Sequence, residues 1–241
     1  DDGRVGGQGC PERHVDDLRI LKDALAREEA VVSWSTKRLE HQRLHNNGEG
    51  DREPLEPLKR HVDEPEEGYN LKVLQYNING ICNKLDELLH YVEKNNILIA
   101  AIQETKLTSK SKQPKTPNYT FVRKDRGVNK GGGLAFLVHK DINFTLENTP
   151  AILEQDPHLE TMTISIPGEN DNDQLYIRNV YIPPQSSCAP QYSPPLNNIY
   201  EGLGESSMVI GDFNAHHELW LTEANSDTRG RLLVDSISGI D

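Results

Sequence analysis

Residues 71–106 read LKVLQYNINGICNKLDELLHYVEKNNILIAAIQETK. The run LKVLQYNI (71–78) is typical of a buried strand, and the turn signal Asn79-Gly80 follows it. The next apolar residues recur at helical spacing and predict one helix face, made of Leu85, Leu88, Leu89 and Val92. The run ILIAAI (97–102) predicts a second strand. Strand, helix and strand within this length form a βαβ unit, so we expect the two strands to be parallel neighbours.

Shorter strand patterns fill the rest of the chain and set the fold class. They lie at 119–125, 133–140, 161–166, 174–182 and 208–213, with a short helical stretch at 197–203. Many strands, few helices and one βαβ unit predict an α/β sandwich of mixed sheets, not a doubly wound parallel sheet. The three glycines at 131–133 predict a turn. A phosphate-cradling loop is the alternative there, but no Lys-Ser/Thr pair follows.

The composition separates a charged leader from a more apolar domain. The chain has 241 residues with 26 Lys/Arg and 38 Asp/Glu, giving a formal net charge of −12. Residues 1–70 contain 28 of these charged residues, and the much longer segment 71–241 contains the other 36. We therefore expect residues 1–70 to be a solvated leader and residues 71–241 to form the domain with the core.

Within the leader, one segment has a helical pattern. Apolar residues recur every seven positions at Leu18, Leu25, Val32 and Leu39, which predicts a helix over about residues 15–44. Residues 46–69 are rich in Gly, Pro and acidic side chains and are predicted to be a disordered linker. Neither segment has a motif that indicates a function.

Composition also excludes some classes of protein. No apolar run approaches the roughly 20 residues that a membrane helix needs. The acidic balance argues against a uniformly basic nucleic-acid binder, although it leaves room for a local basic face. The three cysteines, Cys10, Cys82 and Cys188, are too few and too far apart for a disulfide framework or a zinc site. We therefore expect a reducing, intracellular compartment.

Polar side chains repeatedly follow the buried strands at their carboxyl ends. These residues are Asn77, Asn79, Glu104, Tyr181, Asp212 and Asn214. In α/β architectures such ends line the ligand crevice, although any one of them is also compatible with an ordinary turn residue. Two carboxylates with neutral amide oxygens suit Mg²⁺, which takes few protein ligands and keeps several waters. A lightly ligated Mg²⁺ beside Asn and Tyr donors is typical of a phosphoester site.

Four ordered motifs resemble those of the endonuclease/exonuclease/phosphatase superfamily: QYNING (75–80), QETK (103–106), VYIPP (180–184) and GDFNAHH (211–217). Within the superfamily, QETK resembles the corresponding motif of the apurinic-endonuclease-like branch. The longer strings RKDR…GGGLAFLVH, GDFNAHHELW and DTRGRLL resemble the endonuclease domain of jockey-like non-LTR retrotransposons. The resemblance covers residues 71–241. It implies a DNase I-like, four-layered sandwich that nicks target DNA, with a reverse transcriptase in the same polyprotein.

The resemblance also implies a role for each strand-end residue. Glu104 is the expected principal ligand of Mg²⁺, with Mn²⁺ as the alternative ion, and Asn77 binds or orients the metal shell. Asn79 supports the site at a position where repair relatives have Asp. Tyr181 hydrogen-bonds the scissile phosphate and Asp212 orients the attacking water. Asn214 holds phosphate oxygens nearby.

Two elements of the family pattern have no match in this sequence, namely a late Asp and a terminal Ser-Asp-His. The sequence ends at Ser238-Gly239-Ile240-Asp241, where relatives continue with their final strands. His216 and His217 belong to the loop after the GDFN strand and do not simply replace the missing His. We therefore expect this chain by itself to be poorly folded or to have little activity.

A basic window directly follows Glu104 and is the candidate DNA-binding surface. Within 25 residues it contains Lys106, Lys110, Lys112, Lys115, Arg123, Lys124, Arg126 and Lys130, with a single acid, Asp125. A solvated Lys-rich loop is the alternative. Contact with phosphates needs local positive charge, so we expect double-stranded DNA as the partner, with element RNA reached through the parent polyprotein. The resemblance implies cleavage of target DNA, so we expect the protein to be in the nucleus at that step.

Three hypotheses therefore remain. The first is a retroelement target-site endonuclease. The second is another enzyme of the superfamily, such as an abasic-site repair endonuclease, an inositol-phosphate phosphatase or a sphingomyelinase. The third is a DNA-binding remnant without catalysis, which would bind duplex in a salt-dependent way and not cleave it.

Overall fold

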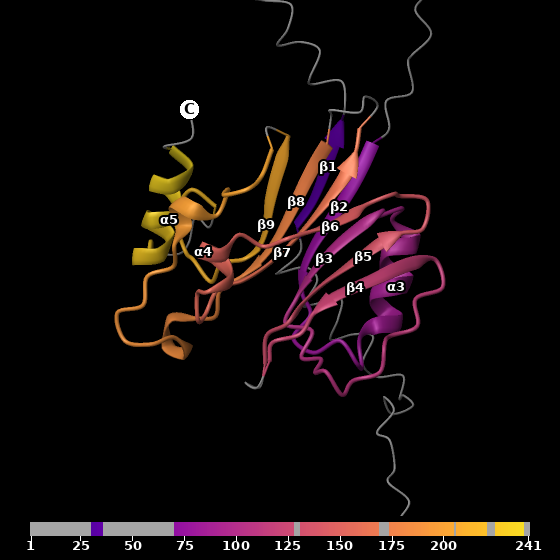
Figure 1. The fold of residues 1–241 in the computed structure, drawn as a ribbon, viewed down its shortest axis with the longest axis horizontal. Coiled ribbons are helices and arrows are strands. Elements are labelled where there is room, and N and C mark those ends of the chain that lie inside the picture. The colour runs from indigo at the N-terminus through magenta and orange to yellow at the C-terminus, as the bar shows by residue number, and fades with distance from the viewer. Residues whose placement is uncertain are drawn as a thin grey trace, which may run out of the picture.

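Two mixed β-sheets pack face to face in the computed structural model, which describes residues 30–35, 70–127, 131–168, 174–204, 206–220 and 225–238 (Figure 1). The first sheet has the order β1-β2-β3-β5-β4, from β1 (Ala30–Ser35), β2 (Asn70–Asn77), β3 (Ile99–Gln103), β4 (Tyr119–Lys124) and β5 (Leu134–His139). The second has the order β6-β7-β8-β9, from β6 (Thr145–Glu147), β7 (Glu160–Pro167), β8 (Gln174–Tyr181) and β9 (Ser207–Asp212).

Each sheet contains one parallel pair of strands. β2 and β3 are parallel and are joined through helix α3 (Leu85–Lys94), so the βαβ unit predicted from the sequence is confirmed. β8 and β9 form the parallel pair of the other sheet. The remaining pairs of neighbours are antiparallel. The carboxyl ends of the four parallel strands are therefore brought to two neighbouring sheet edges.

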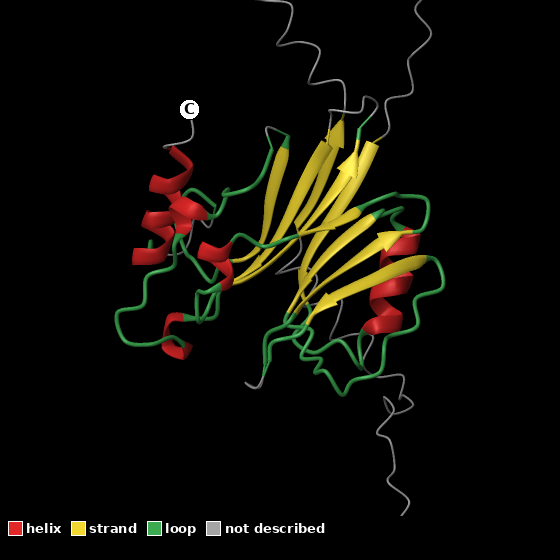
Figure 2. Ribbon diagram, in the orientation of Figure 1, coloured by secondary structure: helices red, strands yellow, loops and turns green. Residues whose placement is uncertain are grey.

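The core occupies three layers between and outside the sheets. Apolar side chains such as Val73, Phe136 and Ile164 fill the space between the two sheets. Leu88 and Val92 of α3 pack on the outer face of the first sheet. The outer face of the second sheet is covered by α4 (Ala151–Glu154), the 3₁₀ turn η4 (Leu196–Asn198) and α5 (Thr228–Ser238). Figure 2 shows the helices on the two outer sides of the sheets, which confirms the four-layered sandwich.

Strand β3 shows why the strands of the first sheet could be predicted from their apolar sequence. All five of its residues are buried, as expected for a central strand covered on both faces. α3 buries Leu88 and Val92 and has acidic residues in its first turn and Lys94 in its last, which suits the helix dipole. The three glycines at 131–133 all have positive φ and lie before β5, within the turn region expected from the sequence.

The helix predicted over about 15–44 is wrong for residues 30–35, which form strand β1. This segment, AVVSWS, has two β-branched residues and a tryptophan, which favour a strand, and it pairs antiparallel along β2. The backbone pairing offered by the edge of β2 outweighs the seven-residue apolar spacing. The rest of the predicted helix and the linker at 46–69 lie outside the described residues.

Four further elements were not predicted: β6, α4, α5 and the 3₁₀ turn η3 (Gln185–Ser187). All are short or weakly patterned, except α5, whose sequence TRGRLLVDSIS includes a glycine. The helical stretch expected at 197–203 is a 3₁₀ turn at Leu196–Asn198 followed by turns. In the part of the chain that the structure describes, no helix is both long and apolar enough to span a membrane.

A buried polar contact joins the two sheets behind their parallel strand ends. Asn179 of β8 is fully buried, and its Oδ1 accepts a hydrogen bond from Gln103 Nε2 of β3 at 2.6 Å. Its Nδ2 donates to the carbonyls of Ile102 at 3.0 Å and Ala135 at 3.1 Å. Gln75 Nε2 extends the contact by donating to Gln103 Oε1 at 2.7 Å. We call Gln75, Gln103 and Asn179 the inter-sheet lock.

Replacing Asn179→Leu tests the inter-sheet lock. Leucine is close to asparagine in size but removes all three hydrogen bonds that Asn179 makes to the opposite sheet, so we expect a loss of about 2–4 kcal/mol in the free energy of unfolding. Urea titration followed by circular dichroism measures the loss. Asn197→Leu, at an exposed position in η4, is the matched control and should change stability by less than about 0.5 kcal/mol. Equal effects of the two substitutions would contradict the lock.

Candidate active site

Four strand ends meet at one place, and each supplies a polar side chain. Asn77 is the last residue of β2 and Glu104 follows β3, while Tyr181 and Asp212 are the last residues of β8 and β9. Both parallel pairs end here, one from each sheet. The site therefore lies across the junction of the two sheets.

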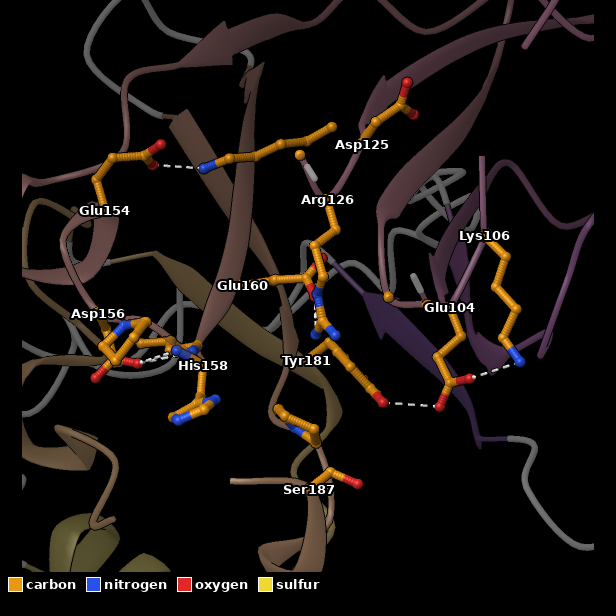
Figure 3. A pocket seen from close by; sticks show the side chains of 17 residues that line it. Glu104, Lys106, Asp125, Arg126, Glu154, Asp156, His158, Glu160, Tyr181 and Ser187 are labelled. Atoms are coloured by element: carbon orange, nitrogen blue, oxygen red, sulfur yellow. Dashed lines mark hydrogen bonds and ion pairs between the residues drawn. The ribbon is translucent and has the colours of Figure 1, made fainter. Parts of the chain in front are cut away.

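The amide of Asn77 bridges the two carboxylates of the site. Its Nδ2 donates to Glu104 Oε1 at 3.1 Å and to Asp212 Oδ2 at 2.7 Å. Tyr181 is buried and donates its hydroxyl to the same Glu104 Oε1 at 2.8 Å (Figure 3). These three hydrogen bonds hold one carboxylate from each sheet on either side of a single amide group.

The other predicted residues close the network. The backbone N–H of Asn79 donates to Asn77 Oδ1 at 3.1 Å, and Lys106 contacts both Asn79 Oδ1 and Glu104 Oε2, the latter at 3.4 Å. Asn214 donates its backbone N–H to Asp212 Oδ1 at 2.9 Å and its side-chain amide to the carbonyl of Ile182 at 2.9 Å. The structure thus brings all six strand-end residues predicted from the sequence into one connected group.

Backbone strain is concentrated at this site. In the described part of the chain six non-glycine residues have positive φ, and four of them belong here: Asn79, Glu104, Lys106 and Asn214. Such conformations are costly for residues other than glycine and persist where the surrounding structure fixes them. On one side Gly80 N–H donates to the Glu104 carbonyl at 2.8 Å, and on the other Thr105 N–H donates to the Gly133 carbonyl at 3.0 Å. The strained segment is therefore held on both flanks.

The surroundings of the two key side chains set their charge. Burial alone would raise the pKa of Glu104, but hydrogen bonds from Asn77 and Tyr181, together with the charge of Lys106, hold its pKa below the usual value. Burial and the neighbouring Glu104 carboxylate raise the pKa of Tyr181. Glu104 is therefore an anion at neutral pH, and Tyr181 keeps its proton and acts as a hydrogen-bond donor.

This donor set fits Mg²⁺. Glu104 and Asp212 offer two carboxylates, the hard oxygen ligands that Mg²⁺ takes in small number while keeping waters. Asn77 turns its Nδ2 toward both carboxylates and its Oδ1 toward the Asn79 N–H, so its oxygen becomes a ligand only when the amide turns over. Among the residues that the structure describes, no three His, Cys, Asp or Glu side chains gather into a group that could hold a metal ion. A zinc-type cluster is thus not formed by the described residues, and a lightly ligated hard cation is the species that suits the site.

A cleft of about 590 Å³ opens beside Glu104 and Tyr181. Only some residues of the predicted basic window line it. Lys106, Lys124 and Arg126 line this cleft. Arg123 instead points into the loop before β4, where its Nη2 donates to the Ser111 carbonyl at 2.9 Å. Lys110, Lys112 and Lys115 are exposed and are not part of the lining, and Lys130 lies outside the described residues. The structure therefore places three of the eight bases beside the strand ends.

Two residues near the site were missed by the sequence analysis. Glu160, the first residue of β7, pairs with Arg126 in the cleft. Arg229 of α5 is buried and donates through Nη1 to the carbonyls of Pro183 and Phe213, each at 2.9 Å, so it ties together the loops that follow β8 and β9. The sequence gives little sign of either role. Charged residues such as Glu160 and Arg229 are common on protein surfaces, and nothing near them in the sequence indicates that they are buried.

His216 makes no hydrogen bond with the network of six strand-end residues; it contacts Asp227 instead. Its Nδ1 lies 3.0 Å from Asp227 Oδ2, and Asp227 in turn accepts the backbone N–H of Gly230 at 2.6 Å in the first turn of α5. Asp227 therefore serves as a helix cap, and His216 is its neighbour. This agrees with the sequence argument that His216 is part of the loop after the GDFN strand.

Comparison with known proteins places the chain in a family. The model of the Endonuclease/Exonuclease/phosphatase family matches residues 74–239. The chain belongs to the Endonuclease/Exonuclease/phosphatase family. All six strand-end residues lie within the match, so the network described above is built from the family's part of the chain. The family is one of phosphodiesterase and endonuclease enzymes.

Two known proteins illustrate the similarity. The chain is 26% identical over 172 residues to the probable RNA-directed DNA polymerase from transposon BS of Drosophila melanogaster; the match covers 70% of the chain and 18% of that protein. The fold is similar to the endonuclease domain of TRAS1, a telomere-specific non-LTR retrotransposon, with a TM-score of 0.51 and 16% identity. This second match covers 70% of the chain and 69% of that structure.

Asn77→Asp tests the bridge between the carboxylates. It removes the donor shared by Glu104 and Asp212 and adds a third negative charge, so we expect a loss of about 2 kcal/mol in stability without divalent ions. Mg²⁺ offsets the repulsion and should raise the melting temperature of this variant more than that of the wild type. Thermal melts with MgCl₂, and with NaCl at matched ionic strength, measure the difference.

Asn118→Asp is the matched control for this experiment. Asn118 also donates to a carboxylate, Glu93 Oε1 at 2.8 Å, but on an exposed surface away from the strand ends. It should show no additional response to Mg²⁺. Equal Mg²⁺ shifts in Asn77→Asp and the wild type would rule out a cation site between the two carboxylates.

Proposed function

We propose that the chain is the Mg²⁺-dependent endonuclease domain of a non-LTR retroelement and nicks double-stranded target DNA. The observation that carries this proposal is the network in which Asn77 joins Glu104 and Asp212 while Tyr181 donates to Glu104. This set of groups suits hydrolysis of a phosphodiester. The two carboxylates offer oxygens to a metal ion, and the protonated phenol and the nearby Lys and Arg side chains can stabilise charge on the phosphate. The cleft beside these residues gives the substrate backbone access to them.

Each residue has a role in this proposal. Glu104 and Asn77 would hold Mg²⁺, which neutralises charge on the phosphate when it is bound. Tyr181, kept protonated by its surroundings, donates a hydrogen bond to a phosphate oxygen. Asp212 has both oxygens fixed by Asn77 and by the Asn214 backbone, so it can hold a water in one orientation for in-line attack. Asn214 holds a phosphate oxygen, and Asn79 and Lys106 keep this edge of the site in place.

The retroelement context rests on the relatives. The similar Drosophila melanogaster protein is described as a polymerase from a transposon, and the structural relative is a retrotransposon endonuclease domain. The chain spans less than a fifth of the length of the polymerase it matches. A reverse transcriptase in the same polyprotein, element RNA as a partner and action in the nucleus are therefore further parts of the proposal.

Single-turnover nicking of supercoiled plasmid tests the proposed activity. With the full chain in excess over plasmid, we expect slow formation of open circles that needs Mg²⁺ and stops when the metal is chelated. Glu104→Gln removes the charge of the principal ligand at nearly constant shape, so we expect nicking to fall by about a hundredfold or more. Glu147→Gln, at a partly buried carboxylate on β6 that accepts from Ser165, is the matched control and should nick as the wild type does.

The same assay separates the competing functions. Cleavage confined to an abasic duplex, with intact plasmid left closed, would indicate a repair endonuclease. Salt-dependent binding of labelled duplex without Mg²⁺-dependent cleavage would indicate a DNA-binding remnant. Nicking that persists in Glu104→Gln would overturn the assignment of Glu104 as the principal metal ligand.

A further inference from the structure

Glu160 occupies a position that faces the active site from the second sheet. It is the first residue of β7, and its Cα partner across the sheet is Tyr181. Its carboxylate is largely buried and both of its oxygens are used. Oε1 accepts from Arg126 Nε at 2.5 Å (Figure 3). Oε2 accepts from the backbone N–H of Gly133 at 2.7 Å.

This pairing fixes where the guanidinium of Arg126 lies. Its central carbon is 5.5 Å from the centre of the Tyr181 ring, a distance at which a cation and an aromatic face attract each other. Figure 3 shows the group between Glu160 and Tyr181, and both Arg126 and Tyr181 line the cleft with Glu104. Nε and Nη2 lie against Glu160, so the remaining donors of this five-donor group are left for another acceptor.

Glu160 also supports the backbone on which Glu104 depends. The Gly133 carbonyl accepts from Thr105 N–H at 3.0 Å, and the Gly132 carbonyl accepts from Lys106 N–H at 2.9 Å. A Cβ on Gly132 would lie 2.3 Å from Glu160 Oε1 and 2.4 Å from Arg126 Nε, so the ion pair fills the space that a side chain would need. The pair is therefore seated directly on the glycine turn.

The charges of the cleft explain why the placement of one cation matters. Its lining includes Lys106, Lys124 and Arg126 but also five acids: Glu104, Asp125, Glu154, Asp156 and Glu160. Lys106 lies against Glu104, and Lys124 is paired with Glu154. A cleft with more acids than bases does not attract a phosphate by its average potential. It needs a donor held at a defined point, which a planar guanidinium supplies better than an ammonium.

We propose that Arg126 forms a subsite for a DNA phosphate beside Tyr181, and that Glu160 is the positioning residue that holds it there. The proposal rests on the function proposed above. Glu160 does not touch the DNA. It acts by keeping the Arg126 guanidinium over Tyr181, with its free donors available to a phosphodiester oxygen.

Glu160→Gln separates these contacts with little change in shape. A carboxylate accepts at both oxygens, whereas an amide accepts at one and donates at the other, so Gln cannot bind Arg126 and the Gly133 N–H at once. We expect the dissociation constant for labelled duplex, measured by fluorescence anisotropy with Ca²⁺ in place of Mg²⁺, to rise about tenfold in Glu160→Gln and in Arg126→Ala. The negative slope of log affinity against log salt concentration should become shallower by about 0.9 in each variant.

The double variant decides whether Glu160 acts through Arg126. If it does, Glu160→Gln adds nothing to the loss of affinity and of salt slope that Arg126→Ala already causes. A residue that only supports the fold would lower the melting temperature and leave the salt slope unchanged. Glu147→Gln again serves as the matched control and should alter neither affinity nor slope.

Arg126→Lys keeps the experiment informative if Glu160→Gln does not fold. Lysine preserves the charge and the ion pair but cannot reach Glu160 and a phosphate together, so affinity should fall with the melting temperature unchanged. Unchanged affinity in both Glu160→Gln and Arg126→Lys would overturn the proposal, and so would effects that add in the double variant. If the wild type still nicks plasmid in that case, the proposed endonuclease function is unaffected. A wild type that neither binds nor nicks DNA would overturn both.

Discussion

The side chain of Asn179 makes three hydrogen bonds to the opposite sheet, and the geometry of the site depends on them. Its partner Gln103 directly precedes Glu104, and Asn179 itself lies two residues before Tyr181, on the same face of β8. Two apolar sheets in contact could slide by a residue at little cost, because apolar packing is not directional. A buried amide pair does not permit such a shift without losing its partners. The lock therefore sets the register in which Glu104 meets Tyr181.

This fixed register allows the strand ends to hold unfavourable conformations. Glu104 and Lys106 have positive φ, and two carboxylates share one amide donor at Asn77. Either feature alone favours a relaxed loop, and both persist because backbone hydrogen bonds from the Gly80 and Gly132–Gly133 segments hold the chain on two sides. The cost of holding the site is met by the sheets behind it. In return, the carboxylates of Glu104 and Asp212 are held in fixed positions, as the proposed metal site requires.

The sequence predicted the sandwich and the six strand-end residues because both depend on local signals. Buried strands such as β3 are continuous apolar runs, and a polar residue that ends such a run is conspicuous. What the sequence could not predict depends on partners that are distant along the chain. Strand β1 forms because the edge of β2 is available, and Glu160 matters because Arg126, 34 residues earlier, is folded onto it. Arg229 likewise acquires its role only when the loops after β8 and β9 meet at its guanidinium.

The basic window shows the same limit for charge. Counted along the sequence it is a strongly positive segment beside Glu104, but folding distributes its members among different tasks. Arg123 supports a loop, Lys124 is paired with Glu154, and Lys106 lies against the metal-ligand candidate itself. The positive charge presented to the cleft is therefore not the sum over the window. It is the charge of the few cations whose positions are fixed, and this is why a carboxylate that holds a guanidinium in place can strengthen binding to an anion.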